Sequence, residues 1–127
     1  MTVRVDHSHY ADSRWYTGSG IYRDVKMIVT DRLHIPVWGT FVTTPVVTDK
    51  YAKVNNQITV RNSYSEPRTA VVEIVYKDNK GNIAAFEVFS IKLNAGEEKI
   101  IDIVSEIKQP DLWSVEIPVL YTAETRI

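Results

Sequence analysis

The 127-residue sequence carries fifteen basic and sixteen acidic residues, and its formal net charge of −1 argues against nucleic-acid or anionic-membrane binding as a main role. Its hydrophobic fraction of 44% and charged fraction of 24% are typical of globular proteins, and no apolar run approaches the roughly 20 residues of a membrane-spanning helix. The absence of cysteine excludes disulfides, thiol catalysis and thiolate metal sites.

The first 34 residues differ in composition from the rest, because charged, histidine and aromatic side chains gather there. The run VKMIVT (25–30) is a strand candidate. His7 and His9 would face the same way on a strand, a spacing that can hold a metal, but no third ligand accompanies them. We therefore expect solvated side chains and no metal site. The change in composition predicts a domain boundary between residues 34 and 35.

Alternation of apolar and polar residues with a period of two dominates the chain after that boundary. The content of β-branched residues favours strands over helices. The pattern leaves open whether 83–93 is one strand or two segments with a bend, and whether the end of 99–107 is a strand or a helical turn. The expected strands cover 39–48, 52–61, 68–78, 83–93, 99–107 and 118–127, with turns at 78–82 and 94–98.

About seven short strands without a convincing amphipathic helix predict an all-β fold, an immunoglobulin-like antiparallel β-sandwich over residues 35–127. All five prolines fall at predicted strand ends or connections, where a missing N–H does least harm. Shared faces are expected for Ala52, Val54, Asn56, Ile58 and Val60 in one strand and for Ala70, Val72, Ile74 and Tyr76 in the next.

Sixteen acidic residues make chance pairs of carboxyls easy to find, and a glycosidase needs two that face each other about 5 to 10 Å apart. None lies in a motif that would set it in a pocket, so we expect no catalytic residue among them. No G-x-S-x-G element is present, and GSG (18–20) is too short for a phosphate loop. The carboxyls weighed for catalysis were Glu73, Glu97, Glu98, Asp102, Glu116 and Glu124.

The stretch RWYTGSGIYRDV (14–25) concentrates aromatic, glycine and charged residues. The rings of Trp15, Tyr16 and Tyr22 could stack on a sugar or pack against neighbouring structure. This leaves open a second class of function, a free-standing β-sandwich module that binds carbohydrate or protein.

A second unusual stretch, QPDLWSVEIPVLY (109–121), sets an apolar cluster between two prolines. Trp113 lies between Pro110 and Pro118, whose rings fix the backbone on either side. This arrangement predicts a rigid corner that plugs one end of the sandwich.

Together these two stretches resemble glycoside hydrolase family 2, the group of β-galactosidases, β-glucuronidases and β-mannosidases. The first resembles the end of the family's sugar-binding jelly roll, R-W-Y-x-G-S-G-I-Y-R. The second resembles the closing signature of its immunoglobulin-like domain, L-W-S-P-x-x-P-x-L-Y, with Val115 in the place of the first proline. The matching signature residues are Gly18, Gly20, Tyr22, Arg23, Trp113, Pro118, Leu120 and Tyr121.

The resemblance implies that residues 1–34 are the C-terminal tail of the jelly roll and that 35–127 are the complete immunoglobulin-like domain. The family's TIM barrel, which carries the catalytic glutamates, would follow Ile127. The isolated chain is therefore expected to be inactive, with no catalytic residue and no cofactor. The parent would be a retaining hydrolase of terminal β-linked sugars, most similar to a β-galactosidase.

The resemblance also implies partners. These are the sugar-binding and TIM-barrel domains of the parent, its carbohydrate substrate, and other copies in a homo-oligomer; nucleic acid and membranes are not expected. Arg14, then Trp15 or Asp12, would be the residues nearest the substrate, or would brace the domain junction.

Overall fold

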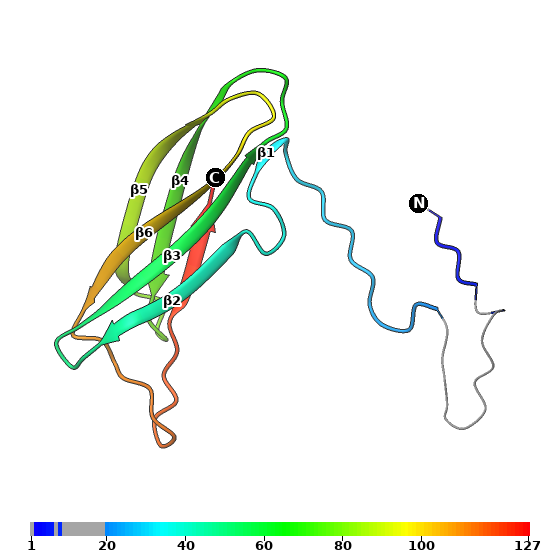
Figure 1. The fold of residues 1–127 in the computed structure, drawn as a ribbon. Coiled ribbons are helices and arrows are strands. Elements are labelled where there is room, and N and C mark those ends of the chain that lie inside the picture. The colour runs from blue at the N-terminus through cyan, green and yellow to red at the C-terminus, as the bar shows by residue number, and fades with distance from the viewer. Residues whose placement is uncertain (1, 7, 9–19) are drawn as a thin grey trace.

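Two antiparallel sheets pack face to face (Figure 1). The computed structural model describes residues 2–6, 8 and 20–127, and in these ranges it contains seven strands, no helix and so no helix able to cross a membrane. The all-β sandwich expected from the alternation is confirmed. The strands are β1 (Leu33–His34), β2 (Thr40–Val47), β3 (Tyr51–Asn62), β4 (Arg68–Lys77), β5 (Ile83–Leu93), β6 (Glu98–Lys108) and β7 (Thr122–Arg126).

Each sheet is built around one long central strand. In the first sheet, β3 pairs with β6 along one edge and with β1 and β2 along the other. In the second, β4 lies between β5 and β7. The pairing of β3 with β6 is unbroken from Tyr51–Lys108 to Arg61–Glu98. This continuous ladder connects the two ends of the sandwich rigidly.

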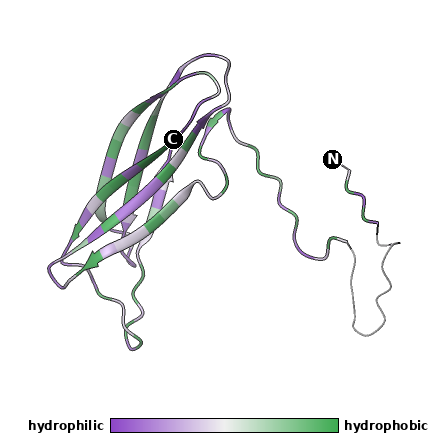
Figure 2. Cartoon of the chain, viewed as in Figure 1, coloured by the Kyte–Doolittle hydropathy of each residue, from purple (hydrophilic) through white to green (hydrophobic). Residues whose placement is uncertain are grey.

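The core lies between the two central strands, and its composition follows from their alternation. Every second residue of β3 from Ala52 and of β4 from Ala70 is buried. Figure 2 shows apolar residues recurring along both strands. Ile58, Val60, Val72 and Ile74 are fully buried, which confirms the two predicted inward faces. Burial of such side chains is the main force that holds the two sheets together.

Some expected elements differ from the structure. The run 25–30 forms no strand; like the rest of Gly20–Arg32 it is exposed, because it has no neighbouring strand to pair with in the described part of the chain. The two-residue β1 was too short to be predicted. The two questions left open are settled, since 83–93 is one strand and β6 remains extended to Lys108.

Pro45 lies inside β2 and not at a strand end, so the prediction for this proline is wrong. The register of β2 against β3 shifts between Thr43 and Val46, which places the proline in an irregularity of the ladder. β2 also forms an edge of its sheet among the described strands. At an irregularity on an edge strand no ladder hydrogen bond from the proline nitrogen is required, so the missing N–H costs little.

The turn between β1 and β2 requires glycine at position 39. The Gly39 N–H donates to the Pro36 carbonyl at 2.8 Å, and the Gly39 carbonyl accepts from the Thr59 N–H at 2.7 Å. A Cβ on Gly39 would lie 2.7 Å from the Pro36 oxygen and 2.8 Å from Cγ2 of Ile35. The buried glycine thus holds the turn close against β3.

We therefore expect Gly39→Ala to lower the free energy of unfolding by about 1–3 kcal/mol, because the backbone of the turn must shift to admit the methyl group. The neighbouring Thr40→Ala changes an exposed side chain and should cost less than about 1 kcal/mol. Urea unfolding of both variants measures the difference. Equal losses would show that the turn is not tightly packed.

Candidate functional site

The connection between β6 and β7, residues 109–121, extends beyond the end of the sandwich as a long loop (Figure 1). Its own hydrogen bonds fix it. The Gln109 N–H donates to the Lys50 carbonyl at 2.8 Å, and the Asp111 N–H donates to the Tyr121 hydroxyl at 3.0 Å, which closes the base of the loop. At the tip, Ser114 and Ile117 exchange two bonds of 3.0 Å. The loop is an ordered structural element.

This loop exposes apolar side chains instead of burying them. Trp113 is 59% exposed, so the prediction that it plugs the sandwich is wrong. Trp113 does not belong to the core cluster or to the residues packed against it, whereas Tyr121 at the base of the loop packs against the core. A fixed loop with so much exposed apolar surface is typical of an interaction site. The exposed apolar residues are Leu112, Trp113, Val115, Ile117 and Leu120.

An apolar cavity of about 350 Å³ lies between this loop and the two sheets. Tyr76 lines it from β4, and Val54 and Ile107 line it from β3 and β6. The Tyr76 side chain is 2% exposed and its hydroxyl has no hydrogen-bond partner in the structure. The loop contributes Pro110, Leu112, Trp113, Val119, Leu120 and Tyr121 to the lining.

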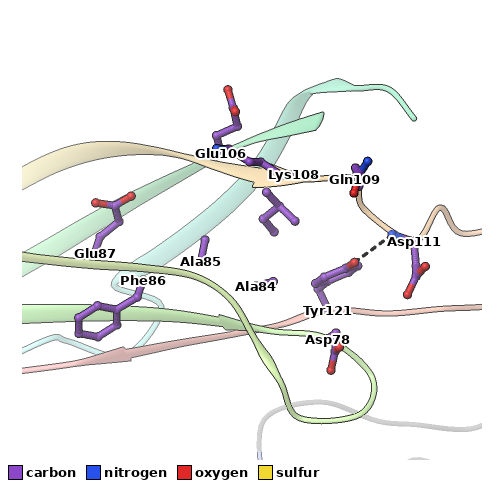
Figure 3. Close-up of a pocket in the computed structure, with 11 residues that line it drawn as sticks. Asp78, Ala84, Ala85, Phe86, Glu87, Glu106, Lys108, Gln109, Asp111 and Tyr121 are labelled. Carbon is purple, nitrogen blue, oxygen red and sulfur yellow. Dashed lines mark hydrogen bonds between the residues drawn. The ribbon is translucent and has the colours of Figure 1, made fainter. Parts of the chain in front are cut away.

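A second cavity, of about 460 Å³, opens between β5 and β6 and is lined by four carboxyls (Figure 3). Glu87 extends from β5 and Glu106 from β6, while Asp78 and Asp111 lie near Tyr121 at the other end. Glu106 and Asp111 are exposed to solvent. A glycosidase acid must be kept protonated by burial or by a neighbouring charge, and an open cavity does not provide this environment.

The carboxyl pKa values also argue against a protonated catalytic acid. Wherever the pKa of a carboxyl in the described residues clearly differs from its ordinary value, it is lowered. The hydrogen bond from the Asn82 side chain lowers the pKa of Asp78. The Lys77 ammonium, 2.6 Å from Glu124, lowers the pKa of that carboxyl. Such carboxyls remain ionised and serve turns and ion pairs. The pKa values of Asp6, Asp31 and Glu97 are lowered in the same way, by hydrogen bonds.

Two further carboxyls considered as catalysts, Glu98 and Asp102, form hydrogen bonds to side chains of the neighbouring strand β3. Glu98 accepts from Arg61 Nε at 2.6 Å on the outer face of the first sheet. Asp102 accepts from Gln57 Nε2 at 3.1 Å. These cross-strand contacts hold β3 against β6.

The predicted site residues divide into three groups. Asp12, Arg14, Trp15 and Gly18 lie outside the described residues, as does Tyr16. Gly20, Tyr22 and Arg23 lie in the exposed N-terminal segment, where the Arg23 guanidinium is 5.2 Å from the centre of the Tyr22 ring. The structure brings Trp113, Pro118, Leu120 and Tyr121 together in the 109–121 loop.

Sequence reasoning missed three positions that the structure makes prominent. Asn62 is fully buried at the end of β3, although asparagine usually signals an exposed turn. Trp38 is 95% exposed, although tryptophan usually signals a core. The sequence pattern places Tyr76 on the correct, inward face of its strand, but it does not predict that the hydroxyl lacks a hydrogen-bond partner. One sequence signal could have indicated that Trp38 lies in an exposed turn: it stands two residues after Pro36 and one residue before Gly39.

Comparisons with known proteins complete this description. The model of glycosyl hydrolases family 2 matches residues 33–127. Beta-galactosidase BoGH2A of Bacteroides ovatus is 36% identical over 127 residues, which cover 100% of this chain and 15% of that protein. A beta-glucuronidase of Formosa agariphila is 29% identical over 133 residues, covering 96% of this chain and 13% of the relative.

Solved structures give the same result. A family 2 glycosyl hydrolase from Bacteroides cellulosilyticus superposes with a TM-score of 0.72 at 32% identity, over 76% of this chain and 13% of the other. The chain thus spans at most 15% of the curated relatives it matches.

Proposed function

Because the chain belongs to family 2 of the glycosyl hydrolases, we propose that it is a non-catalytic immunoglobulin-like domain of a longer β-glycosidase. Residues 35–127 would be that domain, and residues 1–34 would be the end of a preceding sugar-binding domain. The exposed run 25–30 supports this division, because it has the residues of a strand but no partner strand in the described part of the chain.

One observation carries the proposal. The whole chain matches a relative named as a beta-galactosidase, yet it accounts for only 15% of that protein. Hydrolysis by a family 2 enzyme would thus depend on residues that this chain does not have. The open acidic cavity and the lowered carboxyl pKa values support a structural role for the acids that it does have.

The parent enzyme, in this proposal, is similar to a β-galactosidase and hydrolyses terminal β-linked sugars. The greater identity to BoGH2A than to the beta-glucuronidase supports this choice of sugar. Two carboxyls about 5 Å apart in the parent's catalytic domain would act as nucleophile and acid/base in a retaining mechanism. Arg14, Trp15 and Asp12 are the residues of this chain that we propose to lie nearest the substrate.

The domain's task would be to hold its neighbours in a fixed relative position. Two strongly paired sheets give it rigidity, and the 109–121 loop offers an apolar surface for a neighbouring domain of the parent. Such a surface would be costly to expose on a free-standing protein.

The direct test compares the chain 1–127 with the product of the complete gene on a chromogenic β-galactoside and a chromogenic β-glucuronide. We expect no turnover by the chain alone, and turnover of the β-galactoside by the complete protein. Turnover by the chain alone, or a gene that encodes no further domain, would refute the proposal. Faster turnover of the β-glucuronide would correct the sugar and leave the domain assignment intact.

A further inference from the structure

We propose that Trp38 is an anchor through which this domain docks onto another domain of the same polypeptide, an inference that rests on the proposed function. The occupant of this site would be a neighbouring domain with an apolar pocket for the indole ring and an acceptor for its N–H.

The backbone at Trp38 is of a kind that tryptophan rarely adopts. Its φ is +62°, in the left-handed region, and it is one of two non-glycine residues with positive φ in the described part of the chain. With the bond from Gly39 N–H to the Pro36 carbonyl, it takes the third position of a type II turn. Glycine or asparagine normally fills that position, because a larger side chain is strained there.

The same turn leaves the indole in solvent. Trp38 is 95% exposed and the adjacent Val37 is 64% exposed. Neither position contributes to the core, so packing within the domain does not explain a tryptophan at a strained position. Strain that the fold itself does not need points to a function of the side chain, and tryptophan is one of the residues enriched among binding hot spots.

The turn is also a rigid support. Pro36 restricts the backbone before Val37, and Gly39 is fixed against β3 through the Thr59 N–H. β1 and β2, on either side of the turn, both pair with β3. A side chain presented in one fixed position loses little entropy when a partner binds it.

A concave surface adjoins the turn and is continuous with it. A cavity of about 520 Å³ is lined by Val37 and Pro36 of the turn, by Ile28 and Thr30 of the N-terminal segment, and by Arg61 of β3. Three consecutive exposed apolar residues, Met27, Ile28 and Val29, lead into it. Trp38 therefore adjoins a concave, partly apolar surface formed by the turn and the N-terminal segment.

In the proposed function, the covalent connection would bring a preceding domain close to this surface. The N-terminal segment joins the sandwich next to the β1–β2 turn (Figure 1). Its junction is fixed, because the Ser63 N–H donates to the Arg32 carbonyl at 2.8 Å and the Tyr64 hydroxyl donates to Asp31 at 3.0 Å. A domain tethered through this segment would have a high effective concentration at Trp38.

A sugar fits this surface less well than a protein domain. Sugar sites combine an aromatic platform with polar groups that fix the hydroxyls, whereas Pro36 and Val37 beside the indole offer apolar side chains. The relatives are more than six times as long as the chain, since it covers 15% or less of them, so further domains of one polypeptide are the partner that the comparisons favour.

The test uses Trp38→Gly and Trp38→Asn in both the chain 1–127 and the complete protein. In the chain alone, either variant relieves the left-handed strain, so we expect the folding equilibrium constant to rise, by about five-fold for glycine. In the complete protein the same variants remove the anchor, and we expect proteolysis within residues 20–32 to become at least about ten-fold faster. Phe41→Ala, an exposed aromatic on β2 with an ordinary backbone, is the control and should accelerate proteolysis less than two-fold.

Hydroxyl-radical footprinting of Trp38 gives a second measurement that does not depend on a variant. We expect fast oxidation in the chain alone and oxidation about ten-fold slower in the complete protein. Protection in the chain alone that grows with its concentration would assign the site to a second copy and overturn the inference. Full exposure of Trp38 in a complete protein that hydrolyses the β-galactoside would also overturn it, while the proposed function would stand.

Discussion

Replacing Asn62 with alanine should lower the free energy of unfolding of the sandwich by about 3–5 kcal/mol, as much as a large core deletion. Asn62 is fully buried, and its Nδ2 donates to the carbonyls of Glu66 at 2.9 Å and Asn94 at 2.8 Å. Its Oδ1 accepts from the Tyr64 N–H at 3.0 Å. Alanine would leave three backbone groups without their partner at the end of the molecule where two connections meet.

Few other hydrogen bonds join the β3–β4 connection to the β5–β6 turn. The β3–β4 connection and the β5–β6 turn meet through Gly96 N–H, which donates to the Tyr64 carbonyl at 3.1 Å, and through Asn62 N–H, which donates to the Glu97 carbonyl at 2.8 Å. Loss of the Asn62 amide would therefore loosen both at once. Hydrogen exchange should accelerate at Tyr64 and Gly96 before it changes at Val72 in the core.

Asn62→Asp and Asn79→Ala are the matched comparisons. Aspartate has the same shape, but an oxygen would face two carbonyls, so we expect a loss at pH 7 at least as large as that of Asn62→Ala. Its loss should diminish as the pH falls, because the protonated carboxyl can again donate one hydrogen bond. Asn79 lies exposed in the β4–β5 turn and should change stability by less than about 1 kcal/mol. Urea unfolding decides, and a loss below about 1 kcal/mol for Asn62→Ala would show that the three bonds contribute little.

The fold was predictable from the sequence because alternation is a direct consequence of strand geometry. The inward residues of β3 and β4 differ from their neighbours so regularly that only one register buries them. The same geometry explains what was missed. The N-terminal run 25–30 has strand-like residues, but a strand also needs a partner, and a pattern within one segment carries no information about its neighbour.

The candidate site was less predictable because its residues break the average preferences of their type. Asn62 is a buried asparagine and Trp38 an exposed tryptophan, so composition alone assigns each to the wrong environment. The apolar cluster between Pro110 and Pro118 distinguishes the loop around Trp113 in the sequence, and its resemblance to a family signature supports treating it as a unit. Its exposure depends on the path of the backbone beyond the sheets, and the two prolines did not determine that path.

The hydroxyl of Tyr76 separates two contributions to the core, because the ring and the oxygen should act in opposite directions. Tyr76→Ala should cost about 3–5 kcal/mol, since it removes a large side chain that is 2% exposed between β4 and the cavity. Tyr76→Phe should be neutral or stabilising by up to about 1 kcal/mol. The hydroxyl is buried without a partner, so its removal relieves a desolvation cost and breaks no bond.

Both Tyr76 variants can be measured by urea unfolding of the chain 1–127, with equal denaturant slopes as the check that the folded state is unchanged. A loss above about 1.5 kcal/mol for Tyr76→Phe would mean that the hydroxyl has a partner in solution, such as a water molecule in the cavity. In that case the cavity under the 109–121 loop contains water, and its apolar lining is exposed to that water at a cost in free energy. A neutral or stabilising result means instead that the cavity is dry, so that a neighbouring domain which covers Trp113 and Leu120 gains apolar contact without displacing bound water.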